Sequence, residues 1–572
     1  MQLARNIGVT NAKRGPRTVR ASPDREDSMS TTLYTNGLLY LGDGRNEPGH
    51  LLVDEDRITA VLPAAAHAPA ADQVVDLRGG TLLPGFQDAH VHPVLAGLQL
   101  IGVDLTPAHS REGYLRIVAE FADAHPDAAV LRGGGWFGDV FPGGFPSASD
   151  LDEVVADRPV VLYSHDAHGV WVNSAALRAA GIDASTVDPA GGRIFRDETG
   201  HPTGMLVEAA VGLIVGLLPE PDADTLVAAL LAAQDRLHSM GVTAWQDAAV
   251  GASDIGPDAL PAYERTAADG RLTARVVAAL WWDRARGLGQ IDDLLEIRDR
   301  LAAGGRIDGG TVKVMVDGMV ENRTAAMLEP FDGHGDDRGV TFIAQEDLDA
   351  LSVALDAAGF QIHYHAVGDG AVRSCLDAVE AIHAHRGATP NRHHIAHLDV
   401  VDDADVARFA ALDVSANVTA LWARTDEEIV TRKLPLLGPE RARRHFPFAS
   451  IAEAGGRIVG GSDWPVTDPN PLWSVRTAVT RTGVPEDPHA IGTDVLTVPL
   501  LAEQALPLSA ALDAYLSQAA WINRLEQTTG ALREGMLADL VWIDRDVRDV
   551  TGLGAARVLR TVVGGQVVYE AD

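Results

Sequence analysis

The strongest constraint on the fold is an alternation, repeated through the middle of the chain, of apolar strand-like runs with alanine-rich amphipathic segments. Runs such as VTAWQDAAV, GTVKVMVDG and QIHYHAVGDG are separated by segments such as LDALSVALDAAG and DADVARFAAL. A strand followed by a helix, many times over, is typical of a parallel barrel or a doubly wound sheet. We therefore predict an α/β fold, with a (β/α)8 TIM-type barrel as the first choice.

Three further regions depart from this rhythm. Residues 31–84 and 528–572 both consist of short β-rich runs broken by Asn-Gly and Gly-Gly turns, which predicts a composite, sandwich-like β-domain built from both chain ends. The barrel is then expected within residues 85–527. Inside it, residues 104–221 are rich in glycine and proline, and we interpret them as an inserted lid or substrate domain. Residues 1–30 carry arginines without an apolar core, so we expect a disordered tail, or an over-long start with Met29 as the true beginning, rather than a secretory signal.

Composition excludes several classes of partner. The formal net charge is -33, and such a field repels phosphate backbones, so no nucleic-acid partner is expected. No apolar stretch approaches the ~20 residues that a membrane span needs, so no membrane association is expected. The single cysteine, Cys375, excludes intrachain disulfides and cysteine-based zinc clusters and fits a reducing compartment. We predict a cytoplasmic protein, with a homodimer as one open option for its oligomeric state.

Histidine pairs point to a metal centre. His90 and His92 in PGFQDAHVHP stand two residues apart on a predicted strand, so both imidazoles share one face and can reach one ion. Further ligand-type residues follow other predicted strands: His363, His365, His393, His394, His397 and Asp463. All lie near the carboxyl ends of these strands, where barrel active sites are built. The set as a whole predicts a metal site at one mouth of the barrel.

Lys313 is the most unusual residue of the chain, which has only three lysines among its 47 basic residues. It stands between valines in GTVKVMVDG, where an ammonium group is costly to bury. Either its pKa is lowered or the amine is altered chemically, and the alternative is an ion pair with Asp317 or Glu321. A neutral lysine amine can add carbon dioxide and become a carbamate, an anion that can bridge two cations. Arginine has no equivalent chemistry.

The motifs PGFQDAHVHP, GTVKVMVDG, QIHYHAVGDG, IAHLD and GGSDWPV occur in the order seen in the metal-dependent amidohydrolase superfamily, which the chain resembles from about Thr32 to its end. RGGGWF, FPSASDLDEV and GHPTGMLVEAA further resemble the amidohydrolase family 3 branch, which includes N-substituted formamide deformylases. The resemblance implies a hydrolase of an amide, formamide or cyclic amide C–N bond. It also implies two divalent ions, most simply Zn²⁺, with Mn²⁺, Fe²⁺ or Co²⁺ as substitutes.

The same resemblance implies a role for each ligand. His90 and His92 would hold the more buried metal, Lys313 would bridge both metals as a carbamate made with carbon dioxide, and His365 and His397 would hold the second metal. Asp463 would contact the first metal and act as base and then acid for a bridging hydroxide that attacks the carbonyl. His363 is interpreted as a supporting or packing residue, and His393 and His394 as surface or turn residues.

Substrate contacts are predicted from three residues, His168 in the inserted segment, Trp136 and Trp422. One departure affects the pocket, because many relatives have Val-Gln-Pro where this chain has Val418, Thr419 and Ala420. Two alternatives stay open. The first is a mononuclear amidohydrolase, deaminase or esterase in which Lys313 remains an amine, and the second is a catalytically silent regulatory barrel.

Overall fold

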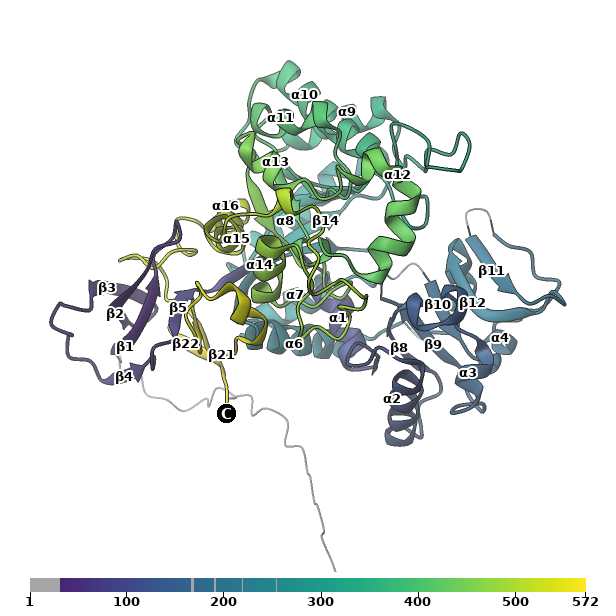
Figure 1. Ribbon diagram of the computed structural model, residues 1–572, viewed down its shortest axis with the longest axis horizontal. Helices are drawn as coiled ribbons and strands as arrows, with labels where there is room; N and C mark the ends of the chain where they lie inside the picture. The colour runs from purple at the N-terminus through teal and green to yellow at the C-terminus, as the bar shows by residue number, and fades with distance from the viewer. Residues whose placement is uncertain (1–30, 166–168, 190–191, 219, 254) are drawn as a thin grey trace, which may run out of the picture.

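The computed structural model describes residues 31–572 except 166–168, 190–191, 219 and 254 (Figure 1). The predicted tail over residues 1–30 and the predicted substrate residue His168 therefore lie outside the described residues. At the centre is a nearly closed, all-parallel sheet of eight strands, which confirms the predicted α/β fold with a barrel-type sheet. In spatial order its strands are β19 (Ile458–Gly460), β18 (Ser415–Val418), β17 (His394–His397), β16 (Gln361–Ala366), β15 (Ile307–Met315), β14 (Arg275–Trp281), β13 (Val242–Val250) and β6 (Phe86–Val91).

These strands are buried along almost their whole length. Every residue of β6, β16, β17 and β18 is buried, which is why the strands are apolar runs rather than alternating patterns. Polar residues inside such strands are costly unless they have partners or a function. His90, Lys313 and His363 are such exceptions, and all three lie in or beside one cluster at the barrel mouth.

The barrel is completed by the segment that follows the short strand β19. The Asp463 amide donates to the His90 carbonyl (2.8 Å), and the His92 amide donates to the Trp464 carbonyl (2.9 Å). The buried Asp88 carboxylate accepts the amides of His90 and Ser462 through one oxygen, each at 3.0 Å. These bonds fix the chain around Asp463 against the end of β6, so two distant ligand-bearing segments become neighbours.

Helices surround the barrel sheet, and the first of them, α1, follows His92 directly (Figure 1). It packs tightly on α6, since a methyl group at Gly97 would lie 1.9 Å from the Ala229 carbonyl oxygen. The helices of this layer are α1 (Pro93–Leu100), α6 (Ala223–Ser239), α7 (Leu260–Ala268), α8 (Ile291–Ala302), α9 (Gln345–Ala357), α10 (Asp369–Arg386), α11 (Asp403–Ala411), α12 (Leu434–Ala442), α13 (Phe448–Glu453), α14 (Pro471–Thr480), α15 (Leu508–Tyr515) and α16 (Ser517–Ile522).

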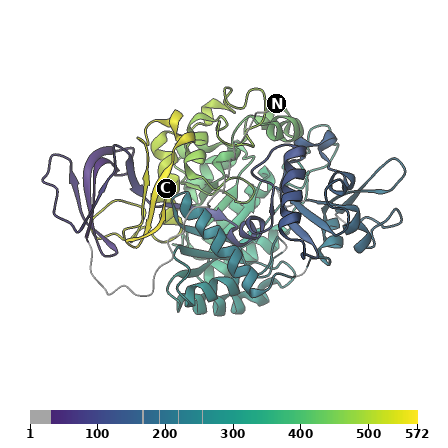
Figure 2. The ribbon, with the colours of Figure 1, turned by 90° about the horizontal axis from the view of Figure 1, so that it is seen from below.

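Between α1 and α6 the chain forms a separate sheet of six strands with its own apolar core. Figure 2 shows this part, in blue, on the opposite side of the barrel from the β-rich segments 31–84 (purple) and 540–570 (yellow). Its elements are β7 (Val103–Asp104), α2 (Arg111–Ala124), β8 (Leu131–Trp136), α3 (Ala148–Asp152), β9 (Val160–Ser164), β10 (Gly169–Val172), α4 (Ser174–Ala179), β11 (Gly192–Arg196), β12 (Pro202–Glu208) and α5 (Gly212–Val215). The segment interpreted as an insertion thus has an architecture of its own.

The two chain ends share one sheet of eight strands, in the order β22-β21-β20-β5-β1-β2-β3, with β4 beside β1. In this sheet β5 pairs with β1 and with β20, so the contact between the ends runs through its middle. The strands are β1 (Thr31–Tyr40), β2 (Asn46–Asp54), β3 (Arg57–Pro63), β4 (Gln73–Asp76), β5 (Thr81–Pro84), β20 (Leu540–Ile543), β21 (Val558–Val563) and β22 (Gln566–Glu570). Among all described residues, none of the helices has the length and apolarity required to traverse a lipid bilayer.

Candidate metal centre

Five barrel strands bring all six predicted metal ligands to one cavity. Each comes from the carboxyl end of its strand or from the turn that follows it, as the parallel arrangement requires. The ligands are His90 and His92 from the end of β6, Lys313 from β15, His365 from β16, His397 from β17 and Asp463 after β19. The remaining lining is largely apolar, with Leu95, Ile255, Met315, Met319, Pro465 and Val466, and it includes Trp422 and His165.

His90, His92 and Asp463 form the tightest cluster. One oxygen of Asp463 lies 3.2 Å from Nε2 of His90 and 3.1 Å from Nε2 of His92. The ligand atoms that the three residues offer all lie within 4.8 Å of one another. Burial and the neighbouring Lys313 lower the pKa of His90 to about 3, so its imidazole is neutral. Burial alone would raise the pKa of Asp463, but the three histidines around it, His397 included, hold it well below its usual value.

A chain of hydrogen bonds determines which nitrogen of His90 carries the proton and which one offers a lone pair to this cluster. Gln361 donates its amide to the carbonyls of Arg392 (2.9 Å) and Ile522 (3.0 Å), so its side-chain oxygen must accept. That oxygen receives the amide of Gln246 (3.2 Å), whose own oxygen lies 2.7 Å from Nδ1 of His363. His363 therefore carries its proton on Nδ1.

The next bond of the relay reaches the cluster. Nε2 of His363, which has no proton, lies 3.0 Å from Nδ1 of His90, and so His90 must donate from Nδ1. Its Nε2 lone pair is left to face Asp463. A neutral imidazole with a free Nε2 lone pair is the form that binds a metal ion. The interpretation of His363 as a supporting residue therefore gains a specific physical basis.

His365 and His397 lie beside each other on the other side of Asp463. Their ring centroids are 4.4 Å apart, and Nδ1 of His397 lies 3.8 Å from the second oxygen of Asp463. Both ring nitrogens of His397 are buried and have no hydrogen-bond partner among the described residues. Burial lowers the pKa of both histidines, so both are neutral. Buried polar atoms without partners are rare, and an imidazole held in this way is suited to bind a metal ion.

The two buried lysines differ in their surroundings. Burial lowers the pKa of Lys313 to about 7, and no ion pair joins it to Asp317 or Glu321 in the described part of the chain. Asp317 instead accepts the backbone amides of three residues (Ala326, Val367 and Gly368), and Glu321 lies beside Lys433. The ion-pair alternative predicted for Lys313 is therefore wrong. Lys313 therefore combines a lowered pKa with the absence of an ion-pair partner among the described residues.

The residues present fit divalent metal ions. Imidazole nitrogens and a carboxylate are the ligands that zinc and related ions prefer, and they are held in neutral or anionic form. The buried imidazole of His397, whose nitrogens have no hydrogen-bond partner among the described residues, offers a lone pair that such an ion would satisfy. Lys313 enters the same cavity, where a carbamate on its amine would supply oxygen ligands between the two groups of histidines.

The other predicted residues differ in whether they line the cavity. Trp422 lines the cavity, with its ring nearly parallel to that of His397. Trp136 instead lies in the core of the inserted segment, where its indole nitrogen donates to the Leu162 carbonyl (2.9 Å). The surface interpretation of His393 and His394 is wrong, since both are buried. His394 begins β17, and because this strand is covered on both faces, it has no solvent face.

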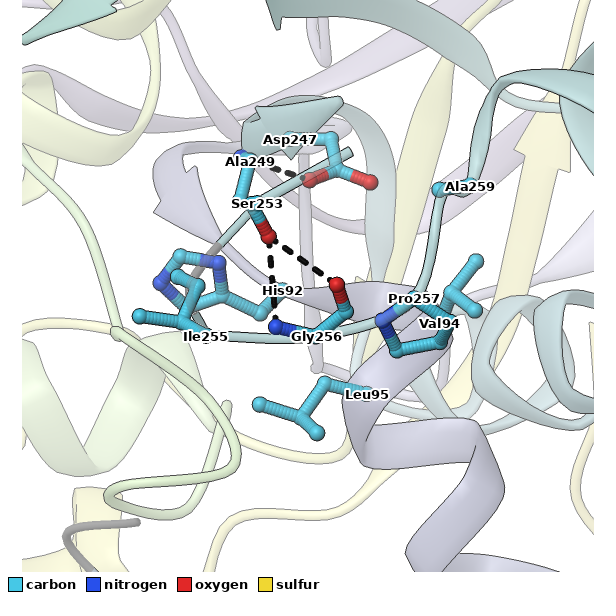
Figure 3. Close-up of a pocket in the computed structure, with 10 residues that line it drawn as sticks. All are labelled: His92, Val94, Leu95, Asp247, Ala249, Ser253, Ile255, Gly256, Pro257 and Ala259. Carbon is cyan, nitrogen blue, oxygen red and sulfur yellow. Dashed lines mark hydrogen bonds between the residues drawn. The ribbon is translucent and has the colours of Figure 1, made fainter. Parts of the chain in front are cut away.

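Two residues were not predicted for the site. His165, at the end of β9, lines the metal cavity and stacks on Phe137 with ring centroids 3.8 Å apart. Asp247, from β13, lines a smaller neighbouring pocket that also includes His92 (Figure 3). Its carboxylate accepts from the Tyr263 hydroxyl (2.8 Å), and burial raises its pKa. A polar residue near the end of an apolar strand was the available signal for Asp247.

Comparison with known proteins agrees with this geometry. The family model described as "Amidohydrolase family" matches residues 73–569. The chain belongs to the amidohydrolase family. This confirms the resemblance inferred from the motifs and makes the protein a hydrolase.

Individual proteins align over most of the amidohydrolase chain. The protein LONG AFTER FAR-RED 3 of Arabidopsis thaliana is 31% identical over 86% of this chain and 83% of its own length. The N-substituted formamide deformylase of Arthrobacter pascens is 28% identical over 95% of this chain and 99% of its own length. A crystal structure described as an uncharacterized metal-dependent hydrolase from Pyrococcus horikoshii has the same fold, with a TM-score of 0.68 and 22% identity over 94% of this chain and 100% of that one.

Proposed function

We propose that this amidohydrolase is a binuclear metal enzyme that cleaves the C–N bond of an amide, formamide or cyclic amide. The observation that carries the proposal is the convergence of all six predicted metal ligands on one cavity, with both nitrogens of His397 buried and without a hydrogen-bond partner among the described residues. Similarity to the N-substituted formamide deformylase of Arthrobacter pascens supports an amide-type bond. Zinc fits the ligand set best.

In this proposal His90, His92 and Asp463 hold one ion, His365 and His397 hold the other, and Lys313 joins them as a carbamate. Bound divalent ions would polarise the substrate carbonyl and make water nucleophilic near neutral pH. Lys313 is suited to its role because its pKa of about 7 supplies the neutral amine that reacts with carbon dioxide. Formation of the N–C bond releases one proton from the amine and leaves a carbamate anion.

Asp463 is the group that moves the proton. Its low pKa keeps it ionised, so it can accept a proton from water as the carbonyl is attacked. It can then deliver this proton to the leaving amine, because the carboxylate stays within the cavity that holds the substrate. The positive φ of 56° at Asp463, together with the hydrogen bond that its backbone amide donates to the His90 carbonyl, holds the carboxylate over the histidines.

The inserted segment is proposed to act as a lid that selects the substrate. Its His165 lies in the cavity wall, and Phe137 stacks between His165 and His489 of the barrel, with centroids 3.8 Å and 4.1 Å away. This stack joins the insertion to the barrel beside the site. We therefore expect Trp422 and His165 to contact substrate, whereas Trp136 supports the segment from its core.

Metal content per chain tests the proposal. Protein purified without chelator should hold about two ions, and Lys313→Ala should hold fewer, because the bridging ligand is lost. Wild-type protein should also release amine from members of a panel of N-formyl and N-acyl amides. One ion in both proteins would favour a mononuclear enzyme. No ion after supply of zinc and bicarbonate, together with no turnover, would favour a catalytically silent barrel.

A further inference from the structure

Lys433 is a buried charge that the metal centre does not use directly. It ends η6, a π-helical turn (Ile429–Lys433), and is 3% exposed. Its ammonium lies 2.8 Å from a carboxylate oxygen of Asp399 and 3.6 Å from one of Glu321. Single π-helical turns within helices are frequent at functional sites. Here the turn ends at a lysine whose ammonium lies between two buried carboxylates.

Trp422 connects this lysine to a predicted metal ligand. The ammonium of Lys433 lies 5.0 Å from the centre of the indole, where the ring quadrupole attracts a cation. The same indole is nearly parallel to the His397 imidazole, at a centroid distance of 5.5 Å and an interplanar angle of 13°. The indole nitrogen is buried without a hydrogen-bond partner among the described residues. The indole orientation therefore depends on packing and on the cation.

Asp399 connects the same lysine to the backbone of that ligand. His397 and Leu398 have φ angles of 81° and 58°, in the left-handed region that residues other than glycine rarely adopt. Such a conformation is unfavourable and persists only where the surrounding structure holds it. Asp399 follows this strained turn, and its carbonyl accepts the Phe446 amide (2.9 Å) and Nδ1 of His445 (2.8 Å). Its side chain is bound to Lys433.

We propose that Lys433 is a positioning residue for His397, acting on its backbone through Asp399 and on its ring through Trp422. The inference rests on the proposed function, in which His397 holds a metal ion. The carboxylates of Asp399 and Glu321 outweigh the effect of burial and keep the pKa of Lys433 above its usual value, so its charge persists. Loss of this charge should loosen the turn and the ring together.

The test compares Lys433→Met with wild type in two measurements. Hydrogen exchange should become faster in the segment 394–400, whose Leu398 and Val400 amides donate to the carbonyls of Ala366 and Val367. The affinity for the weaker of two zinc equivalents should fall about 10-fold or more, the effect typical of changes next to metal ligands. Arg275→Met is the control, because it breaks the ion pair between Arg275 and Asp539 away from the cavity. The Asp539 side chain is 1% exposed, so this variant also leaves a buried carboxylate without its cation. It should lower stability without either local effect.

The outcomes distinguish a positioning role of Lys433 from a role in stability alone. If Lys433→Met loses stability but exchanges and binds zinc as Arg275→Met does, the proposal is overturned. If wild type binds no zinc, the proposed function fails, and the exchange of segment 394–400 alone decides the role of Lys433. If Lys433→Met does not fold, the double variant Glu321→Gln/Lys433→Met is measured in the same way. It removes one of the two buried carboxylates that would otherwise lack a cation.

Discussion

Replacing Gln246 with leucine should weaken metal binding although Gln246 touches no predicted ligand. Gln246 donates its amide to Gln361, so its oxygen must accept from Nδ1 of His363. Nε2 of His363 must then accept from Nδ1 of His90. In Gln246→Leu, Nδ1 of His363 has no acceptor, so either nitrogen of His363 can carry the proton. His90 is then free to place its own proton on Nε2, the atom that lies 3.2 Å from Asp463.

The expected magnitude follows from the geometry. A lost partner next to a metal-binding histidine typically reduces affinity 10–100-fold, which is about 1.4–2.7 kcal/mol of binding free energy. The buried donor left behind costs a further ~1–3 kcal/mol of folding stability. Zinc affinity is measured by competition with a chromophoric chelator at fixed pH, and stability by urea unfolding of the metal-free protein.

The comparison variant is Gln246→Glu, which keeps an acceptor oxygen for His363 but loses the amide donors toward Gln361 and Asn523 and places a buried carboxyl group against their two oxygens, so it should be less stable than wild type. It should retain zinc affinity close to that of wild type. Folded Gln246→Leu protein that binds zinc as tightly as wild type would refute the relay. Equal weakening in both variants would show that the position matters but that the acceptor does not.

Three further changes have outcomes set by the structure. Asp463→Asn should keep most of its zinc but lose most turnover, because the amide cannot accept the proton, and near wild-type activity with unchanged zinc content would exclude Asp463 as the base. Burial lowers the pKa of His238 from 6.5 to about 4, so the unfolded chain binds this proton more readily than the folded chain. The free energy of unfolding should therefore fall by about 3 kcal/mol as the pH drops from 6.5 to about 4. His238→Gln should show a smaller fall in urea unfolding, and an identical pH profile would contradict the assignment. Gly97→Ala should cost roughly 1–3 kcal/mol, since the methyl would meet Ala229 at 1.9 Å, whereas Gly289→Ala, with open space around it, should cost little.

Much of the site was predictable because its chemistry is local to short motifs. Two histidines at strand spacing, a lone lysine among valines and an aspartate after a strand each indicate a chemical role. The parallel arrangement then places the carboxyl ends of the strands at one mouth. Lys313, His397 and Asp463 therefore meet in the cavity that the motifs predicted.

The misses have a common physical cause. The environment of His394, the partners of Asp317 and the relay through Gln246 depend on contacts between elements far apart in the chain. His394 lies against His363 with ring centroids 4.1 Å apart, and Asp317 accepts amides up to 51 residues away. A single strand pattern contains no information about such neighbours. The same limit applies to Trp136, whose aromatic character fits a core as well as a pocket.

The sheet shared by the two chain ends has a consequence for biosynthesis. Strand β5 ends at Pro84, but its neighbour β20 begins at Leu540, so most of the polypeptide leaves the ribosome before this pairing is possible. Until then, β5 presents an open hydrogen-bonding edge that can recruit other nascent chains. Strands β20 to β22 close that edge last. Deletions or bulky fusions at the C-terminus should therefore lower the yield of native protein before they affect the chemistry of the barrel.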